Sequence, residues 1–399
     1  MNFGIFIVIG TILVTCMGQE CPMKYRRLSK NHTFCIPSTC KVEAGGSVSD
    51  SDKEVILKAH NDLRNKLALG QEKQNDVVMP TAANMMKLEW DDELAAIAQA
   101  HSNQCQFEHD SNDQRAVGNF SVGQNLLIMM GTFSIDWNYT RHWYTSEVGY
   151  FKPEYIKPFH FEGEFGHFSQ VIWATTWKVG CGVSGYTEDN MKNLLYTCNY
   201  GPAGNWQDGE AYKVGSPCSA CPENTKCSDE YPGLCSSLTP NGPQPKRPNT
   251  DDYLLYCDFS DKDPQNCKDV KISGSKEMET GKLYTGSYKT AVFNAGENVS
   301  ISFGKFQHKD GLCAYVIGRF GPNDATQSAK SSVKFKFSSS GLIFPSFMKD
   351  SRSSPSWHTI GILMRTSREM EITYTYEVDA DAPAQYFEFN QYGVRGGKM

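Results

Sequence analysis

The cysteines constrain this chain more than any other feature. There are 14 of them in 399 residues, and they occur in clusters. An apolar run from Phe3 to Met17, followed by Gly18, is typical of a signal peptide, so residues 1–18 predict export into an oxidising compartment where cysteines pair. Removing Cys16 with this leader leaves an odd number of cysteines. At least one thiol is then free or pairs with another chain.

Composition and short motifs agree with a secretory route. Sequons for N-glycosylation begin at Asn31, Asn119, Asn138 and Asn298. The formal charge is −6, and no cluster of Lys and Arg offers a surface for phosphates, which argues against a nucleic-acid partner. The N-terminal apolar run is too short to span a bilayer, so we predict no transmembrane segment. We expect a secreted, extracellular glycoprotein.

Cysteine density and composition divide the chain into segments. We predict a signal peptide at 1–18, an N-terminal disulfide-linked segment at 19–50, an α/β domain at 51–210, a cysteine-rich hinge at 211–235, a Pro-rich linker at 236–250 and a β-rich domain at 251–399. The hinge is too short for a core of its own and is expected to hold about two disulfides among Cys218, Cys221, Cys227 and Cys235. Beyond it, Cys257 and Cys267 can close a small loop and leave Cys313 as the odd thiol, but the sequence does not decide this pairing.

Helical and strand patterns alternate within residues 51–210. A capping box at 51–54 followed by apolar residues at helical spacing predicts a helix that ends at Gly70, and Asp91 opens a second helix. Short β-rich runs follow at 171–173, 179–183 and 194–198. The apolar run 126–130 is interpreted as a buried helix face, with a lipid-binding groove as the alternative. Helices and strands that each have an apolar face to bury predict a layered α/β domain.

Residues 251–399 show a different pattern. The runs 298–303, 332–337 and 371–376 alternate polar and apolar residues with a period of two, and they are separated by Gly, Ser, Asn and Asp. This pattern predicts a β-sandwich or jelly roll. The whole chain is therefore expected to be of the α+β class.

Several motifs in 51–210 point to one family. The segments 105–109, 122–126, 143–147 and 166–173, with 60–64 before them and 196–206 after them, resemble the successive motifs of the CAP superfamily of cysteine-rich secretory, antigen 5 and pathogenesis-related 1 proteins. The resemblance implies an α/β/α sandwich. In detail the chain is similar to the arthropod venom allergen 5 group, with a C-terminal extension.

The resemblance also implies a disulfide pattern. It predicts bridges from Cys21 to Cys35, from Cys40 to Cys105 and from Cys181 to Cys198. A fourth bridge of the group would need one cysteine just after Cys21 and another near Asn112, and both positions lack it. Joint absence is what a disulfide requires, which supports the alignment.

The family's cleft maps onto His109, Gln124, Glu147 and His167. His109, Glu147 and His167 could hold Zn²⁺, but Gln124 replaces an acid, so we expect weak metal binding and no required cofactor. Catalysis by Glu147 and His167, with Ser146 as nucleophile, is an alternative that the diverging directions of Ser146 and Glu147 disfavour. A third interpretation is a buried hydrogen-bonded network that holds the helices over the sheet.

Other candidates are interpreted as structural. His60 is expected to be a satisfied buried histidine near Asn61 and Arg64, and His101 to serve packing. The tryptophans of this domain are expected in the core: Trp137, Trp143, Trp173, Trp177 and Trp206. The function predicted from all of this is a non-enzymatic secreted effector that binds extracellular or host proteins or a hydrophobic ligand. The alternatives are a secreted peptidase and a sterol or fatty-acid carrier.

Overall fold

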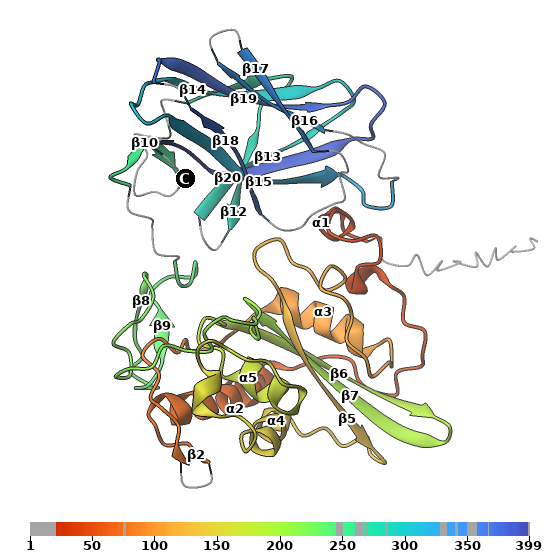
Figure 1. Ribbon diagram of the computed structural model, residues 1–399. Coiled ribbons are helices and arrows are strands. Elements are labelled where there is room, and N and C mark those ends of the chain that lie inside the picture. Colours follow the sequence, from red (N-terminus) through yellow and green to blue (C-terminus); the bar gives the residue numbers. More distant parts are fainter. Residues whose placement is uncertain are drawn as a thin grey trace, which may run out of the picture.

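The computed structural model describes residues 21–74, 77–244, 250–259, 267, 270–283, 286–327, 333–339, 342–348, 357–365 and 367–397. The predicted signal peptide at 1–18 and residues 245–249 of the predicted linker lie outside this set. The fold is α+β, with helices and one sheet in the first half and two packed sheets in the second (Figure 1). None of the helices within the described ranges is long and apolar enough to cross a membrane.

The first half is built on a five-stranded sheet. Its order is β1 (Ala44–Gly45), β6 (Lys178–Glu188), β7 (Met191–Gly201) and β5 (Gly123–Met130), with β4 (Glu89–Trp90) parallel to β6. The side chains of β6 alternate between the two faces. Val179, Cys181 and Val183 join a buried cluster with residues of the helices, whereas Gly180 and Gly182 lie on the opposite face.

Helices cover both faces of this sheet. On one face α3 (Asp92–Ser102) packs against β6 and β7, and a Cβ at Gly180 would lie 2.2 Å from the backbone nitrogen of Ala95. Only glycine permits this close approach. On the other face lie α2 (Asp50–Ala68), α4 (Tyr139–Glu147) and α5 (Gly166–Val171), as Figure 1 shows. The domain is thus an α/β/α sandwich.

The two predicted helices are present, but the first begins earlier than its sequence suggested. Ser49 is the N-cap of α2: its Oγ accepts a hydrogen bond from the Asp52 amide at 3.3 Å, and Asp52 Oδ2 accepts from the Ser49 amide at 3.1 Å. The predicted cap, Ser51, is already inside the helix. An aspartate can replace the usual glutamate of the box because its carboxylate reaches the same backbone donor.

Two local predictions were wrong. Residues 171–173 are the end of α5 and the turn after it, not a strand, and the carbonyls of Val171 and Trp173 accept hydrogen bonds from the Arg64 side chain. Residues 126–130 belong to β5, not to a helix, because they pair with β7 along their whole length. In both segments, long-range partners overrode the local apolar pattern.

Six disulfides occur among the described residues. The pairs Cys21–Cys35, Cys40–Cys105 and Cys181–Cys198 are those that the resemblance implied. The hinge holds Cys218–Cys227 and Cys221–Cys235, next to the small ladder of β8 (Thr225–Cys227) and β9 (Cys235–Ser237). Cys257 pairs with Cys267, and Cys313 is a buried free thiol.

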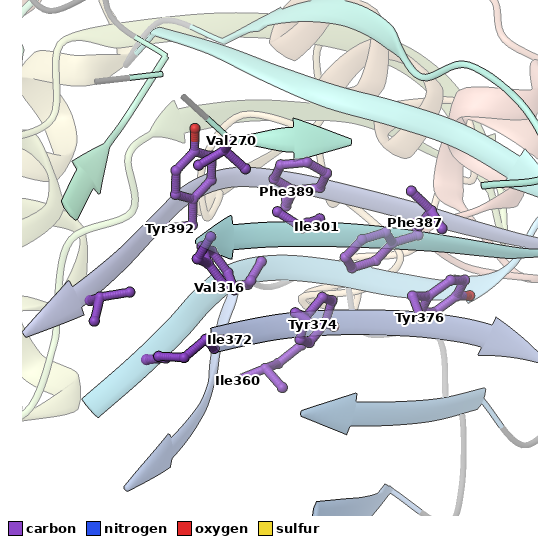
Figure 2. Close-up of a cluster of buried hydrophobic side chains, with 14 of the residues drawn as sticks. Val270, Ile301, Val316, Ile360, Ile372, Tyr374, Tyr376, Phe387, Phe389 and Tyr392 are labelled. Carbon is purple, nitrogen blue, oxygen red and sulfur yellow. The ribbon is translucent and has the colours of Figure 1, made fainter. Parts of the chain in front are cut away.

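The second half is a β-sandwich, as predicted. One sheet contains β10 (Tyr253–Cys257), β12 (Glu279–Leu283), β13 (Gly286–Phe293), β15 (Leu312–Pro322), β18 (His358–Met364) and β20 (Gln385–Gly396). The other contains β11 (Lys271–Gly274), β14 (Asn298–Phe306), β16 (Val333–Ser339), β17 (Leu342–Met348) and β19 (Met370–Val378). Aromatic and branched side chains fill the space between the sheets, among them Tyr374, Tyr376, Phe387 and Phe389 (Figure 2).

A polar seam joins the two halves. The short helix α1 (Met23–Arg26) lies between them in Figure 1. Arg27 Nε donates to Asn323 Oδ1 at 2.8 Å, and the Ala325 amide donates to the Arg26 carbonyl at 2.8 Å. Arg319 of the β-rich domain donates to the Gly118 carbonyl at 2.6 Å. The extension is therefore docked on the first domain next to the loop that carries Gly118.

Candidate functional site

The predicted cleft residues surround one open cleft of about 930 Å³. His109, Gln124 and His167 line it, and Glu147 lies behind His167, to which it is hydrogen-bonded. The four side chains come from the loop after α3, from β5, from the end of α4 and from the start of α5. Residues far apart in the sequence are therefore brought together as the motifs suggested.

Glu147 orients the ring of His167. Its Oε1 lies 2.5 Å from His167 Nδ1, and its Oε2 accepts a hydrogen bond from the Phe168 amide at 2.8 Å. The indole of Trp143 stacks on the imidazole with 5.7 Å between ring centroids. A carboxylate can only accept here, so Nδ1 carries the proton and Nε2 is the nitrogen left for a ligand.

Gln124 plays the matching role for His109. Its Nε2 donates to Asp110 Oδ1 at 3.1 Å and to Asn199 Oδ1 at 3.2 Å, which turns its Oε1 toward His109 Nδ1 at 2.8 Å. His109 must then donate through Nδ1. Partial burial lowers the pKa of His109. The hydrogen bond to Gln124 opposes this effect and the nearby Arg115 and His167 add to it, so the net shift favours the neutral ring.

The glutamine at 124 has a local explanation. It lies against the Asp110 carboxylate, which also pairs with Arg115 at 3.0 Å. A second carboxylate at position 124 would face Asp110 directly and lose the two hydrogen bonds that the amide donates. The amide avoids this repulsion and still presents an acceptor to His109.

Comparisons with known proteins agree with this geometry. Residues 57–200 match the family model described as CAP, the cysteine-rich secretory protein family. A cysteine-rich venom protein of Tityus serrulatus is 65% identical over 100% of this chain and 99% of its own length. This chain belongs to the CAP family. A venom allergen 5 of the same organism is 38% identical over 98% of this chain and 97% of its own, so the extension is shared with both relatives.

Solved structures are similar to about half of this chain. The structure of BmVAL-1 is 27% identical, covering 49% of this chain and 98% of its own, with a TM-score of 0.42.

A three-ligand metal site is not preassembled in this CAP domain. The candidate ligand atoms of His109, Glu147 and His167 do not all lie within 4.8 Å of one another. Glu147 already binds His167 and the Phe168 amide. Within the described ranges, the one cluster that meets this distance is Cys218, Cys221 and Cys235, whose sulfurs are in disulfides and so are not thiolate ligands.

The nucleophile of a serine-type peptidase is also not assembled. Ser146 is exposed on α4, and its Oγ donates to the His142 carbonyl at 2.7 Å. Glu147, the next residue, points instead to His167. The two side chains diverge as neighbouring residues on a helix must.

Aromatic side chains at the rim were missed by the sequence reasoning. Trp206, predicted to be a core residue, is 55% exposed and lines the cleft together with Phe161, which is 46% exposed. The Trp206 Nε1 donates a hydrogen bond to the Ala203 carbonyl at 2.9 Å, so this polar atom has a partner although the ring is exposed. Trp357 of the β-rich domain lines the same cleft, and no local pattern in the sequence indicates this.

The histidines predicted to be structural are buried, as are Trp143, Trp173 and Trp177, whereas Trp137 is half-buried. Both His60 nitrogens are satisfied, Nδ1 by the Ile56 carbonyl at 2.8 Å and Nε2 by the Tyr200 hydroxyl at 2.9 Å. His101 is also buried and bonds to Thr197 at 3.0 Å. Asn31, Asn119 and Asn138 are exposed and Asn298 is half-buried, and their glycosylation stays a prediction.

Proposed function

We propose that this venom-type CAP protein acts outside the cell as a non-catalytic binding protein, which recognises an extracellular target through its cleft. The observation that carries the proposal is the direction of the Ser146 side chain. Glu147 orients His167, but the Ser146 Oγ donates to the His142 carbonyl of its own helix, so the predicted nucleophile is not hydrogen-bonded to the imidazole that would have to activate it. Two oriented imidazoles in an open cleft suit binding better than turnover.

Weak divalent metal binding is part of this proposal. His109 and His167 would hold Zn²⁺ through Nε2, with Glu147 and Gln124 as outer partners that fix the two rings. Two protein ligands are fewer than a catalytic zinc site uses. The metal would then cross-link the cleft to a bound partner instead of activating water.

The carrier alternative has less support. The segment 126–130, which was a candidate lipid groove, is strand β5, whose Leu126 is buried and whose Met130 is 66% exposed at the far end of the strand. Gln124 and Asn125 of the same strand line the cleft with polar amides. A sterol or fatty acid would find few aliphatic side chains there.

The test is turnover and metal binding in the same preparations. Mature protein, His167→Ala and Glu147→Gln are incubated with a diverse peptide mixture with and without Zn²⁺, and products are identified by mass spectrometry. Ser146→Ala is the matched control, because its hydroxyl donates to the His142 carbonyl of its own helix. We expect no cleavage by any of them. Cleavage by the wild type that disappears in both cleft variants would overturn the proposal.

Calorimetric titration with Zn²⁺ tests the metal part separately. We expect weak binding by the wild type that is lost in His109→Ala and in His167→Ala and is retained in His142→Ala, an exposed histidine outside the cleft. Zn²⁺ binding that is unchanged in both cleft variants would show that His109 and His167 do not hold the metal.

A further inference from the structure

The β-rich domain closes one side of the CAP cleft. Among the described residues that line the cleft, Trp357 comes from that domain and the others come from the CAP domain. A cleft completed by two domains can select a ligand that neither domain would hold alone. The following proposal rests on the non-catalytic binding function argued above and names its ligand class.

We propose that the cleft binds a neutral oligosaccharide, held between Trp206 and Phe161 of the CAP domain and Trp357 of the β-rich domain. The first observation is the exposure of aromatic rings in a concave site. Trp206 is 55% exposed and Phe161 46% exposed, although large aromatic side chains normally bury most of their surface. The flat carbon–hydrogen face of a sugar ring packs on such surfaces.

The second observation is that the polar lining is mostly uncharged. Asp113 and Arg115 are its oppositely charged side chains, and its amides, which can both donate to and accept from hydroxyl groups, include those of Asn112 and Asn205. Arg115, the lining cation, is already bonded to Asp110 and to the Val122 carbonyl. An anionic ligand would find no uncommitted arginine in the lining, and a lipid would find few aliphatic groups.

The third observation is that Trp357 is held in place. The Arg319 guanidinium carbon lies 4.7 Å from the centroid of the indole, and the Tyr288 ring meets the indole edge-on at 6.0 Å. Arg319 is itself fixed by Glu388 at 2.5 Å and by the Gly118 carbonyl of the CAP domain at 2.6 Å. Both charged groups of the Arg319–Glu388 ion pair are buried, so the pair has a defined geometry. Arg319 is thus a positioning residue for Trp357.

The experiment measures binding of the full mature chain to a printed array of neutral oligosaccharides, followed by calorimetry with the strongest array ligand. Asn119 is a sequon at the cleft rim, so all variants carry Asn119→Gln to keep a glycan of the protein itself out of the site. Trp357→Ala and Trp206→Ala are compared with Phe107→Ala and Leu363→Ala. These controls remove exposed apolar side chains of each domain that do not line the cleft.

We expect an array ligand whose Kd rises about tenfold or more in each tryptophan variant and not in the controls, because a stacked ring contributes on the order of a factor of ten. Trp357→Phe should recover part of the loss. Arg319→Gln combined with Glu388→Gln, which removes both charges together, should weaken binding while the Trp357 side chain is still present.

The outcomes separate this inference from the proposed function. Array binding that Trp357→Ala leaves unchanged would overturn the two-domain cleft. Array binding by the Asn119→Gln protein that does not exceed binding by the same protein with both Trp206→Ala and Trp357→Ala would overturn the sugar ligand. Both results leave a non-catalytic cleft standing. Binding of palmitate or of an intact peptide at the tryptophans instead of an oligosaccharide would also overturn the ligand class. Hydrolysis of any probe that depends on His167 would overturn the proposed function itself.

Discussion

The two domains solve the problem of a stable core in different ways. In the part of the chain that the structure describes, the CAP domain and its hinge hold five disulfides, and polar side chains are buried at the centre of the fold. The β-rich domain holds one disulfide and a core of stacked aromatic rings (Figure 2). The first architecture fixes loops and side chains around a cleft, and the second forms a rigid body that can be placed against it.

Arg64 is an example of the polar side chains buried at the centre of the CAP domain. It is fully buried on α2 and donates to the carbonyls of Met86, Val171, Trp173, Ala174 and Thr176. One side chain thereby bonds five carbonyls, of which those of Trp173 and Ala174 also accept from the amides of Thr176 and Met86. Desolvation lowers the pKa of Arg64 to about 9, so it still carries its charge at neutral pH.

The largest expected effect follows from that arrangement. Arg64→Met keeps the volume and removes the donors, leaving several buried carbonyls unsatisfied at a cost of about 5 kcal/mol in unfolding free energy. Calorimetry should show the CAP transition at a much lower temperature while the β-rich transition moves little. Arg141→Met, at an exposed helix position, is the control. Equal stability of the two variants would mean that the carbonyls find other partners.

The β-rich domain should respond most to loss of an aromatic ring. Phe387 is fully buried and stacks on Tyr376 with 4.5 Å between centroids. Phe387→Ala should reduce the unfolding free energy of this domain by about 4 kcal/mol through lost burial and a cavity. The CAP transition should stay in place. Leu363→Ala, at a 37% exposed position, should cost far less, and a similar loss in both variants would contradict an aromatic core.

Acidic pH should also lower the stability of one domain more than that of the other. Burial lowers the pKa of His60 to about 4, whereas an unfolded histidine titrates near 6.5. The unfolded state then binds the extra proton between these values, so stability is full above about pH 6.5 and falls by about 3 kcal/mol as the pH drops to about 4. His32 and His109, whose pKa values burial also lowers, add to the same trend.

All three of these histidines are in the CAP half, so acid titration of the full chain should lower its transition first. His60→Gln should flatten the slope of stability against pH between 4 and 6.5, as measured by denaturant unfolding at each pH. An unchanged slope in that variant would place the acid sensitivity elsewhere.

The smallest effect concerns the observed helix cap. Ser49→Ala removes the side chain that accepts from the Asp52 amide and should cost about 1 kcal/mol in the CAP transition. Ser51→Ala, at the cap expected from the sequence, should cost less than half of this. If Ser51→Ala cost more stability than Ser49→Ala, Ser51 would be the N-cap of α2, as the sequence predicted.

Sequence patterns predicted what depends on periodicity and motifs. Period-two runs indicated the sandwich, and the spaced motifs indicated the family, its bridges and the residues His109, Gln124, Glu147 and His167. The segments that failed, 126–130 and 171–173, are apolar runs whose structure is decided by β7 and by Arg64. Trp357 could not be assigned to the cleft because only the docking of two domains brings it there.

The central claim is that these two differently built domains form one docked unit around the cleft, and small-angle X-ray scattering of the mature protein tests it most directly. The account predicts a profile that fits the docked arrangement held by Arg319, Glu388 and the Gly118 carbonyl. It also predicts a larger radius of gyration for the Arg319→Gln, Glu388→Gln double variant. A wild-type profile that fits only two bodies moving independently about the linker would contradict the shared cleft.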